Sequence, residues 1–228
     1  MTWIAAAAGL ALAPSAAAQQ ASGSAEPSLP AEWVERFEWR EIGPANMGGR
    51  ITDLAVFNDD PSTYYVGTAS GGLLKTTDNG VTFEHQFTGQ DTVAIGDISV
   101  SQQNPDLIWV GTGEENPRNS SSFGDGVYKS TDGGATFEHM GLEESFQTGA
   151  LVIHPEDNDT VFVGALGRLW GPNEQRGLFK STDGGESWDK VLYVDANTGC
   201  IDLVMHPADP DAMLAATRAR RRDEFDTT

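Results

Sequence analysis

The stretch KSTDGGATF at Lys129–Phe137 decides the fold, because closely similar stretches occur at two other places in the chain. KTTDNGVTF stands at Lys75–Phe83, and KSTDGGESW stands at Lys180–Trp188. The aspartate within the stretch recurs at intervals of 54 and 51 residues, at Asp78, Asp132 and Asp183. Periods of this size are typical of solenoids, propellers and repeat arrays.

The residues between the copies also repeat, and each copy predicts four short strands. The first strand is apolar and alternating, as at 51–56, and a turn rich in Asn, Asp and Pro follows it. The second strand is a continuous apolar run such as LIWVGT, and the third resembles GVYKST. The fourth begins at the aromatic residue that ends the repeated stretch. Four strands per repeat, arranged radially, form a β-propeller blade, so we predict an all-β chain.

The repeats predict blades at about 50–90, 91–145 and 146–195, and a fourth blade that begins at 196–228. Three and a half blades leave the ring incomplete, because propellers typically have about 4–8 blades. We therefore interpret residues 33–228 as a partial propeller from the N-terminal piece of a longer protein, whose remaining blades would be its partners. Phe37–Ile42 is expected to supply the outer strand of the closing blade.

The repeated stretch is a predicted hairpin turn between the third and fourth strands. The Asp carboxylate can accept hydrogen bonds from backbone amides of its own turn. The turn needs a positive φ, which glycine supplies at Gly80, Gly134 and Gly185. The aromatic residue is expected in the core of its own blade, and the lysine on the solvated outer face. Threefold repetition favours a structural role for the aspartates over a catalytic or metal-binding one.

The N-terminus predicts export. Residues 1–18 have an apolar run and an Ala-rich cleavage site, as in a secretory signal peptide, although no basic residue precedes the run. A low-complexity Ala-rich tail is the alternative. The run is too short to span a membrane, and residues 19–32 read as a disordered lead-in. We expect a secreted, periplasmic or cell-surface protein that is not inserted in a membrane after cleavage.

The composition argues against several classes of ligand. The formal net charge is −20, which argues against nucleic acid and anionic membrane surfaces as ligands. Cys200 is the single cysteine, so it forms no internal disulfide, and its apolar surroundings predict a buried thiol. His154 and His206 occupy matching HP turns, which indicates a structural role. No spacing indicates a metal site, and we expect no cofactor.

The stretches STDGGATF and STDGGESW resemble the Asp-box or BNR repeat of sialidases, sortilin-type receptors and family-74 glycoside hydrolases. FEWREIGPANMGGRITDLAV, VGTGEENPR, GDGVYKSTDGG and ALGRLWG together resemble a family of large exported bacterial proteins described as sortilin-like or BNR-repeat glycosyl hydrolases. This resemblance covers Trp33 to about Arg222. It implies a propeller that binds a polysaccharide or a peptide.

The resemblance leaves catalysis open. In family-74 hydrolases a catalytic Asp lies in the first blade, and the matching position here is Ser70, which cannot serve as a carboxylate base. Arg50 faintly resembles the Arg-Ile-Pro entry of sialidases, but the proline is absent and no second or third arginine has the matching context. The leading hypothesis is a carbohydrate- or peptide-binding module. The alternatives are the N-terminal part of a glycoside hydrolase and a structural surface protein.

The loops between second and third strands are the expected ligand site, because they should emerge opposite the repeated turns. The second blade inserts EENPRNSSSFGDG and the third inserts RLWGPNEQRG. An exposed Trp beside Arg and carboxylates suits stacking on a sugar ring or holding a peptide end. Ordinary packing between blades, with local Arg–Glu pairs, is the competing interpretation. The ligand-binding candidates are Arg50, Glu114, Glu115, Arg118, Arg168 and Trp170.

Overall fold

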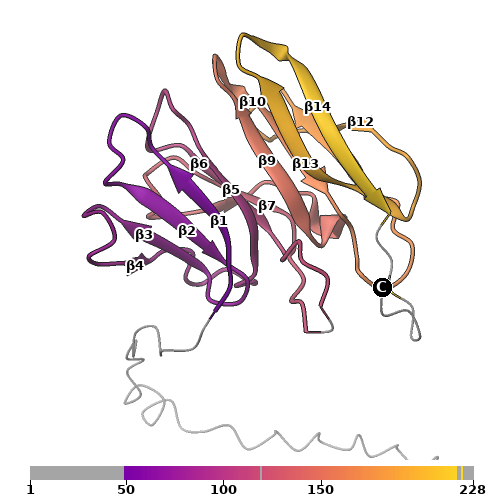
Figure 1. Ribbon diagram of the computed structural model, residues 1–228, viewed down its shortest axis with the longest axis horizontal. Helices are drawn as coiled ribbons and strands as arrows, with labels where there is room; N and C mark the ends of the chain where they lie inside the picture. The colour runs from indigo at the N-terminus through magenta and orange to yellow at the C-terminus, as the bar shows by residue number, and fades with distance from the viewer. Residues whose placement is uncertain (1–48, 119, 220–221, 223–228) are drawn as a thin grey trace, which may run out of the picture. The chain divides into compact units, whose positions relative to one another are not determined.

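The computed structural model describes residues 49–118, 120–219 and 222 (Figure 1). These residues form fourteen β-strands and one 3-10 helix, η1 (Glu143–Ser145), so the predicted all-β class is confirmed. The predicted signal peptide, the lead-in and the expected strand Phe37–Ile42 lie outside the described residues.

The strands form three four-stranded antiparallel sheets and one hairpin, each in chain order. We call the sheets the first to third blades and the hairpin the start of the fourth. The first holds β1 (Ile51–Val56), β2 (Tyr64–Thr68), β3 (Leu73–Thr76) and β4 (Glu84–His85). The second holds β5 (Ile95–Val100), β6 (Ile108–Thr112), β7 (Val127–Ser130) and β8 (Glu138–His139). The third holds β9 (Thr148–His154), β10 (Asp157–Ala165), β11 (Gly177–Ser181) and β12 (Asp189–Leu192), and the hairpin pairs β13 (Thr198–His206) with β14 (Asp209–Ala219).

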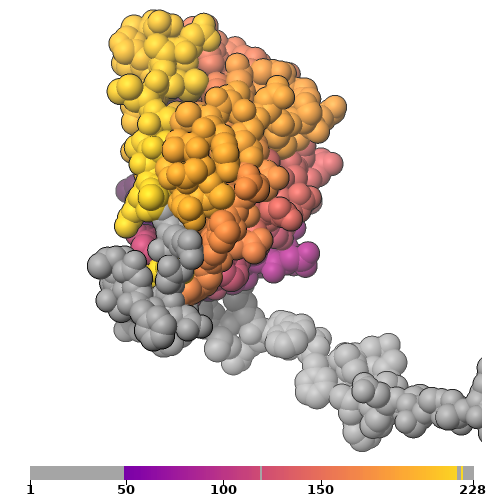
Figure 2. Space-filling view, turned by 90° about the vertical axis from the view of Figure 1, so that its right-hand side faces the viewer, coloured from indigo at the N-terminus to yellow at the C-terminus, as the bar shows by residue number. Residues whose placement is uncertain are grey.

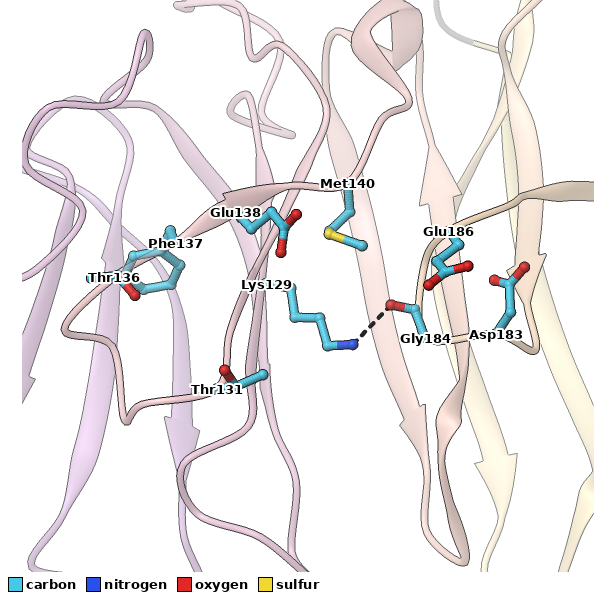
Figure 3. A pocket seen from close by; sticks show the side chains of 9 residues that line it. All are labelled: Lys129, Thr131, Thr136, Phe137, Glu138, Met140, Asp183, Gly184 and Glu186. Atoms are coloured by element: carbon cyan, nitrogen blue, oxygen red, sulfur yellow. Dashed lines mark hydrogen bonds between the residues drawn. The ribbon is translucent and has the colours of Figure 1, made fainter.

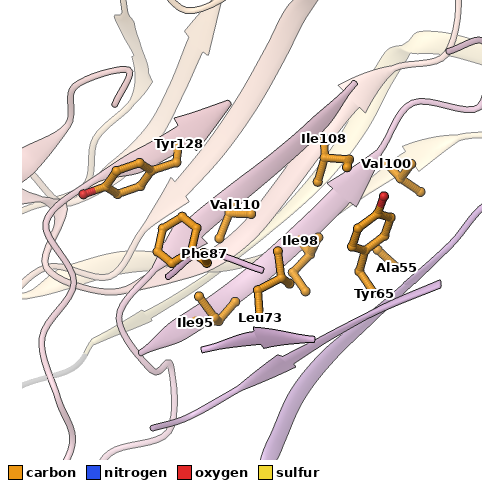
Figure 4. Close-up of a cluster of buried hydrophobic side chains, with 10 residues drawn as sticks. All are labelled: Ala55, Tyr65, Leu73, Phe87, Ile95, Ile98, Val100, Ile108, Val110 and Tyr128. Atoms are coloured by element: carbon orange, nitrogen blue, oxygen red, sulfur yellow. The ribbon is translucent and has the colours of Figure 1, made fainter. Parts of the chain in front are cut away.

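The blades stack face to face, with their first strands β1, β5, β9 and β13 next to one another. Three apolar clusters fill the spaces between successive blades. Between the first and second blades, Tyr65 and Leu73 meet Ile95 and Ile108, all fully buried (Figure 4). Each blade is therefore a thin sheet whose apolar faces are removed from water by its neighbours, which is why a period of about fifty residues specifies the fold.

The two end faces of the stack remain exposed in the described part of the chain. Ile51 and Leu54 of β1 are 61% and 54% exposed, and Leu214 of β14 is 79% exposed. The β13–β14 hairpin, yellow-orange in Figure 2, lies at the surface beside the third blade. The ring is thus not closed, as predicted, and each end face has the apolar character of an interface between blades.

The repeated turns, residues 76–83, 130–137 and 181–188, share one hydrogen-bond pattern, seen here in the second blade. Asp132 Oδ1 accepts hydrogen bonds from Ser130 Oγ (2.8 Å) and Thr136 N (2.9 Å), and Oδ2 accepts one from Thr136 Oγ1 (2.6 Å). Gly134, at φ 91°, donates its N–H to Ser130 Oγ at 2.9 Å. The first and third blades repeat these contacts with Asp78 and Asp183 at their centres.

In the second and third blades the aromatic residue of the repeated turn lies between blades, which corrects the prediction that it packs inside its own blade; Phe83 of the first blade meets Tyr64 of its own blade and is 43% exposed. Trp188 of the third blade meets Trp109 of the second edge to face, with ring centres 5.9 Å apart. Its Nε1 donates to Met140 O of the second blade at 2.7 Å. Phe137 likewise packs on Phe87 of the first blade. The repeat therefore specifies how blades dock as well as how each hairpin turns.

Two of the three repeat lysines, Lys75 and Lys129, join neighbouring blades, which corrects the prediction that they are solvated charges on an outer face. Lys75 Nζ donates to Gly133 O of the second blade at 2.7 Å, and Lys129 Nζ donates to Gly184 O of the third at 2.9 Å. Each ammonium also lies over an aromatic ring of its own blade. Lys75 Nζ is 5.5 Å from the centre of the Tyr65 ring, and Lys129 Nζ is 5.4 Å from the centre of the Trp109 ring. Both lysines are partly buried, and their ammonium groups lie against a glycine of the next blade.

Antiparallel connections place the loops on two opposite faces. The repeated turns share one face with the turns between first and second strands, since Gly133 N donates to Asp106 O (3.0 Å) and Gly184 N to Asp159 O (2.9 Å). The β2–β3, β6–β7 and β10–β11 loops lie at the other ends of the strands. We call this second face, where the first strand of each blade begins, the mouth face.

Candidate functional site

The mouth face is built from two insertions that meet at Phe146. Residues 113–126 connect β6 to β7, and residues 166–176 connect β10 to β11. Gly124 N donates to Phe146 O at 2.7 Å, and the Phe123 and Phe146 rings meet edge to face at 5.9 Å. On the other side, the Arg168 guanidinium lies 4.9 Å from the Phe146 ring centre. The loops of the second and third blades thus form one continuous surface.

Glu114 lies beneath this surface and is 1% exposed. Its Oε1 forms an ion pair with Nη2 of Arg50, which immediately precedes β1 of the first blade. Arg118 Nε lies 4.0 Å from the same oxygen, with half of its side chain exposed. Burial, and then the nearby Arg118 charge, lower the pKa of Arg50. Because Arg50 balances the Glu114 charge, Glu114 and Arg50 anchor the loop, and Arg118 faces solvent.

Glu115 points elsewhere, into a groove that runs along the first strands of the blades. The two glutamates are neighbours in the β6–β7 loop, but Glu114 pairs with Arg50 whereas Glu115 lines the groove. The groove has a volume of about 480 Å³ and is lined by residues of all four blades. These residues are Thr52, Asp53, Gly96, Asp97, Glu115, Gly149, Ile201, Asp202 and Ala216. It is a polar channel in which carboxylates dominate.

Two of the groove carboxylates tie neighbouring blades together. Asp53 Oδ2 accepts a hydrogen bond from Ile98 N of the second blade at 3.1 Å, and Asp97 Oδ2 accepts one from Leu151 N of the third at 2.5 Å. Burial, and then the Asp53 charge, raise the pKa of Asp97 well above its ordinary value. This pair was not predicted from the sequence, although Asp53 and Asp97 stand at matching positions of the first strands.

Arg176 was also missed, and it organises the β10–β11 loop from within. Its side chain is fully buried, and Nε donates to Ala196 O at 2.8 Å, while Nη1 and Nη2 donate to the carbonyls of Leu166 and Arg168. Desolvation lowers the pKa of Arg176, but the guanidinium remains charged because its ordinary pKa is far above neutrality. This buried fork holds Arg168 and Trp170 at the surface, with Trp170 42% exposed.

Arg222, which follows β14 in the chain, joins the same surface. Arg222 N donates to Leu169 O at 2.9 Å, and Trp170 and Arg222 form a parallel bridge. The mouth face therefore extends from the second blade to the start of the fourth. The structure gathers Arg118, Arg168 and Trp170 on it, directs Glu115 into the groove, and places Arg50 and Glu114 in a supporting ion pair.

A second hollow of about 300 Å³ lies on the opposite face, between the repeated turns of the second and third blades (Figure 3). Its floor holds Met140 and the Lys129–Gly184 hydrogen bond, and its rim holds Glu138 and Glu186. The polar groups of its turns are already used in holding the blades together. We therefore take the mouth face, with its insertions and groove, as the candidate site.

The described part of the chain offers neither a metal centre nor a membrane-spanning helix. Residues 49–118, 120–219 and 222 hold no group of three or more His, Cys, Asp or Glu side chains arranged to bind a metal ion. The same residues include no helix of the length and apolarity that a membrane span requires. Cys200 is fully buried in β13, and burial raises the pKa of its thiol to about 11, so it is not a nucleophile.

Comparison with known proteins identifies the fold. No protein-family model and no curated protein matches the chain. Solved structures do match: the GH74 enzyme of Niastella koreensis has a TM-score of 0.57 at 21% identity, over 75% of this chain and 26% of that one. An ancestral GH74 enzyme has a TM-score of 0.61 at 18% identity, over 78% and 23%. YCF48 bound to the D1 peptide has a TM-score of 0.50 at 14% identity, over 72% and 47%.

At these low sequence identities, the similarity shows a shared fold and nothing further. The chain is an incomplete β-propeller whose blades are similar to those of family-74 enzymes, and it spans about a quarter of their length.

Proposed function

We propose that this chain is the N-terminal part of an exported β-propeller protein that binds carbohydrate at the mouth face. The observation that carries the proposal is the groove of about 480 Å³, to which all four blades contribute and into which Glu115 reaches from the β6–β7 insertion. Clefts of this size, with a few convergent polar groups, are the usual form of a small-ligand site. The predicted signal peptide and the partial-propeller organisation belong to the same proposal.

The chemistry of the face favours sugars. Carboxylate oxygens accept hydrogen bonds from hydroxyl groups, and Asp53, Asp97 and Glu115 line the groove. Phe123 and Trp170 are 47% and 42% exposed on the mouth face and offer aromatic surfaces on which a pyranose ring can stack. The threefold turn geometry supports assignment of the repeats as Asp-boxes. A peptide is the competing ligand, since the similar YCF48 structure holds one.

A glycan array probed with the full-length protein tests this proposal. We expect binding that Glu115→Gln and Trp170→Ala each weaken about tenfold or more, because a stacked aromatic face is worth about 1–3 kcal/mol. Glu186→Gln is the matched control for Glu115→Gln, since it removes a carboxylate from the opposite face. Binding to peptide arrays but to no glycan would reject the carbohydrate proposal.

Glycoside hydrolysis is the second candidate, and the Asp97 environment favours it. A carboxylic acid whose pKa is raised by burial and by a neighbouring carboxylate is suited to donate a proton to a leaving group. Asp53 lies close enough to influence it, although both also hold backbone amides. A reducing-sugar assay on the full-length protein, with Asp97→Asn and Glu115→Gln, decides the point: turnover lost in these variants supports hydrolysis, and binding without turnover rejects it.

A further inference from the structure

The arginines are distributed unevenly over this acidic protein. All six described arginines, Arg50, Arg118, Arg168, Arg176, Arg218 and Arg222, lie in or beside the mouth-face loops. The four lysines lie instead on third and fourth strands, and two of them hold neighbouring blades together. In a chain with a formal net charge of −20, the guanidinium groups of the described residues therefore gather on one face.

Three of these arginines are exposed, and their settings differ from those of the structural ones. Arg118 is half exposed beside a carboxylate that Arg50 already neutralises. Arg168 lies exposed over the Phe146 ring, and its backbone carbonyl is held by the buried Arg176. Arg218 is exposed near the end of β14, opposite Gly199. A side chain on Gly199 would come within 3 Å of Ala165 and Leu166, which places this strand end against the start of the β10–β11 loop.

We propose that Arg118, Arg168 and Arg218, exposed on the same face, bind oxyanions carried by successive residues of the sugar ligand, so that the ligand is an acidic polysaccharide, namely a polyuronate. The inference rests on the proposed carbohydrate function and names its substrate class. Planar guanidinium groups bind carboxylates through paired, charge-assisted hydrogen bonds. A uronic acid residue fits both parts of the face, since its hydroxyls suit the groove carboxylates and its carboxylate suits the exposed arginines.

The negative net charge of the protein means that a polyanion can bind only where the exposed arginines lie. A protein with a formal charge of −20 repels a polyanion at long range, so binding requires local positive charge at the site. Because Arg50 and Glu114 cancel, the charge of Arg118 is not consumed by its nearest carboxylate. Trp170 stands two residues from Arg168 and gives the same residue of the ligand a ring to stack on.

The test compares polygalacturonate with its methyl ester, which has the same backbone without the charge, on the full-length protein at low salt. We expect the ester to bind at least tenfold more weakly, and Arg118→Ala and Arg168→Ala each to weaken polygalacturonate binding about tenfold. Arg118→Lys should recover only part of the loss, because an ammonium lacks the planar fork. Ala135→Glu makes the same change of net charge on the opposite face and should leave affinity within about twofold.

Each contrary outcome has a distinct meaning. Equal affinity for polygalacturonate and its ester would overturn the oxyanion inference and leave carbohydrate binding intact. Binding to dextran sulfate but not to polygalacturonate would retain the arginine site and overturn the carboxylate. Binding to acidic peptides with no affinity for any glycan would overturn both this inference and the proposed function. Arginine variants with unchanged affinity and unchanged melting temperature would remove these residues from the site.

Discussion

At the scale of single residues, the same side-chain type plays opposite parts in different places. Asp132 is exposed and saturated with hydrogen bonds from its own turn, and these bonds lower its pKa to about 2. Asp97 is enclosed between strands, where burial and Asp53 raise its pKa. Glu114 is buried as well, but the guanidinium of Arg50 balances its charge. Local partners, more than residue identity, decide what each carboxylate contributes.

Asp132 gives a prediction with a definite pH window. Because its folded pKa lies below the unfolded value of about 3.9, its contribution is complete above pH 4 and is lost as pH falls towards 2. Asp132→Ala should lower the melting temperature at pH 7 by several degrees, and the difference from wild type should shrink at pH 2. Calorimetry at both pH values checks this. Ligand affinity, corrected for the folded fraction, should not change; a selective loss of binding would contradict a structural role.

Asp97 should respond to pH in the opposite direction. Its raised folded pKa means that its contribution is complete below about pH 3.9 and is lost as pH rises through the folded value. Asn remains neutral and can still accept the hydrogen bond from Leu151 N, so Asp97→Asn should match or exceed wild-type stability at pH 7. Asp97→Ala loses the acceptor and should be destabilised. Urea unfolding at pH 7 separates the two; if Asn were as harmful as Ala, the ionised form would be the stabilising one.

At the scale of elements, the repeated turn is a docking device between blades. Trp188 shows this most directly, since both its ring and its N–H contact the preceding blade. Trp188→Ala should destabilise the chain by about 2–4 kcal/mol, because it opens the space between the second and third blades. Phe83 occupies the same place in the first blade but is 43% exposed, so Phe83→Ala serves as the matched comparison. Denaturant unfolding of both variants tests the claim, and equal losses would contradict it.

The sequence predicts where the strands of each blade lie, but it predicts poorly which side chains contact a neighbouring blade. Alternating apolar residues, the NP and HP turns and the glycines of the repeat each carry a local signal, so four strands per repeat could be read directly. The repeat period does not show which blade a side chain faces. For that reason the prediction placed Phe137 and Trp188 inside their own blades and the repeat lysines on the outer face. Arg176 was missed because a buried arginine bound to backbone carbonyls leaves no partner residue to find in a sequence.

The candidate site could be predicted only in part, for the same reason. Insertion length identified the β6–β7 and β10–β11 loops, and residue type identified Arg118, Arg168 and Trp170. The sequence could not show that Glu114 and Glu115 diverge, one into an ion pair and one into the groove. It also gave no sign that Phe146 joins the two insertions, because Phe146 lies in the connection between blades.

At the scale of the whole molecule, protection from solvent falls from the middle of the stack towards its ends. β6 is buried at all five residues, whereas most of β14 is exposed and it pairs only with β13 among the described strands. Amide hydrogen exchange followed by mass spectrometry should therefore find the slowest exchange in Ile108–Thr112 and faster exchange in Asp209–Ala219. Equal protection in both segments would show that other parts of the chain cover the fourth blade.

The central claim is that ligand binds at the mouth face of an incomplete propeller, and hydroxyl-radical footprinting tests it most directly. The full-length protein would be oxidised with and without polygalacturonate, and the modification of aromatic residues quantified on both faces. We predict that Trp170 and Phe123 become protected while Phe83 and Phe137, next to the repeated turns, keep their reactivity. Protection of Phe83 and Phe137, with Trp170 and Phe123 unchanged under saturating ligand, would contradict the account.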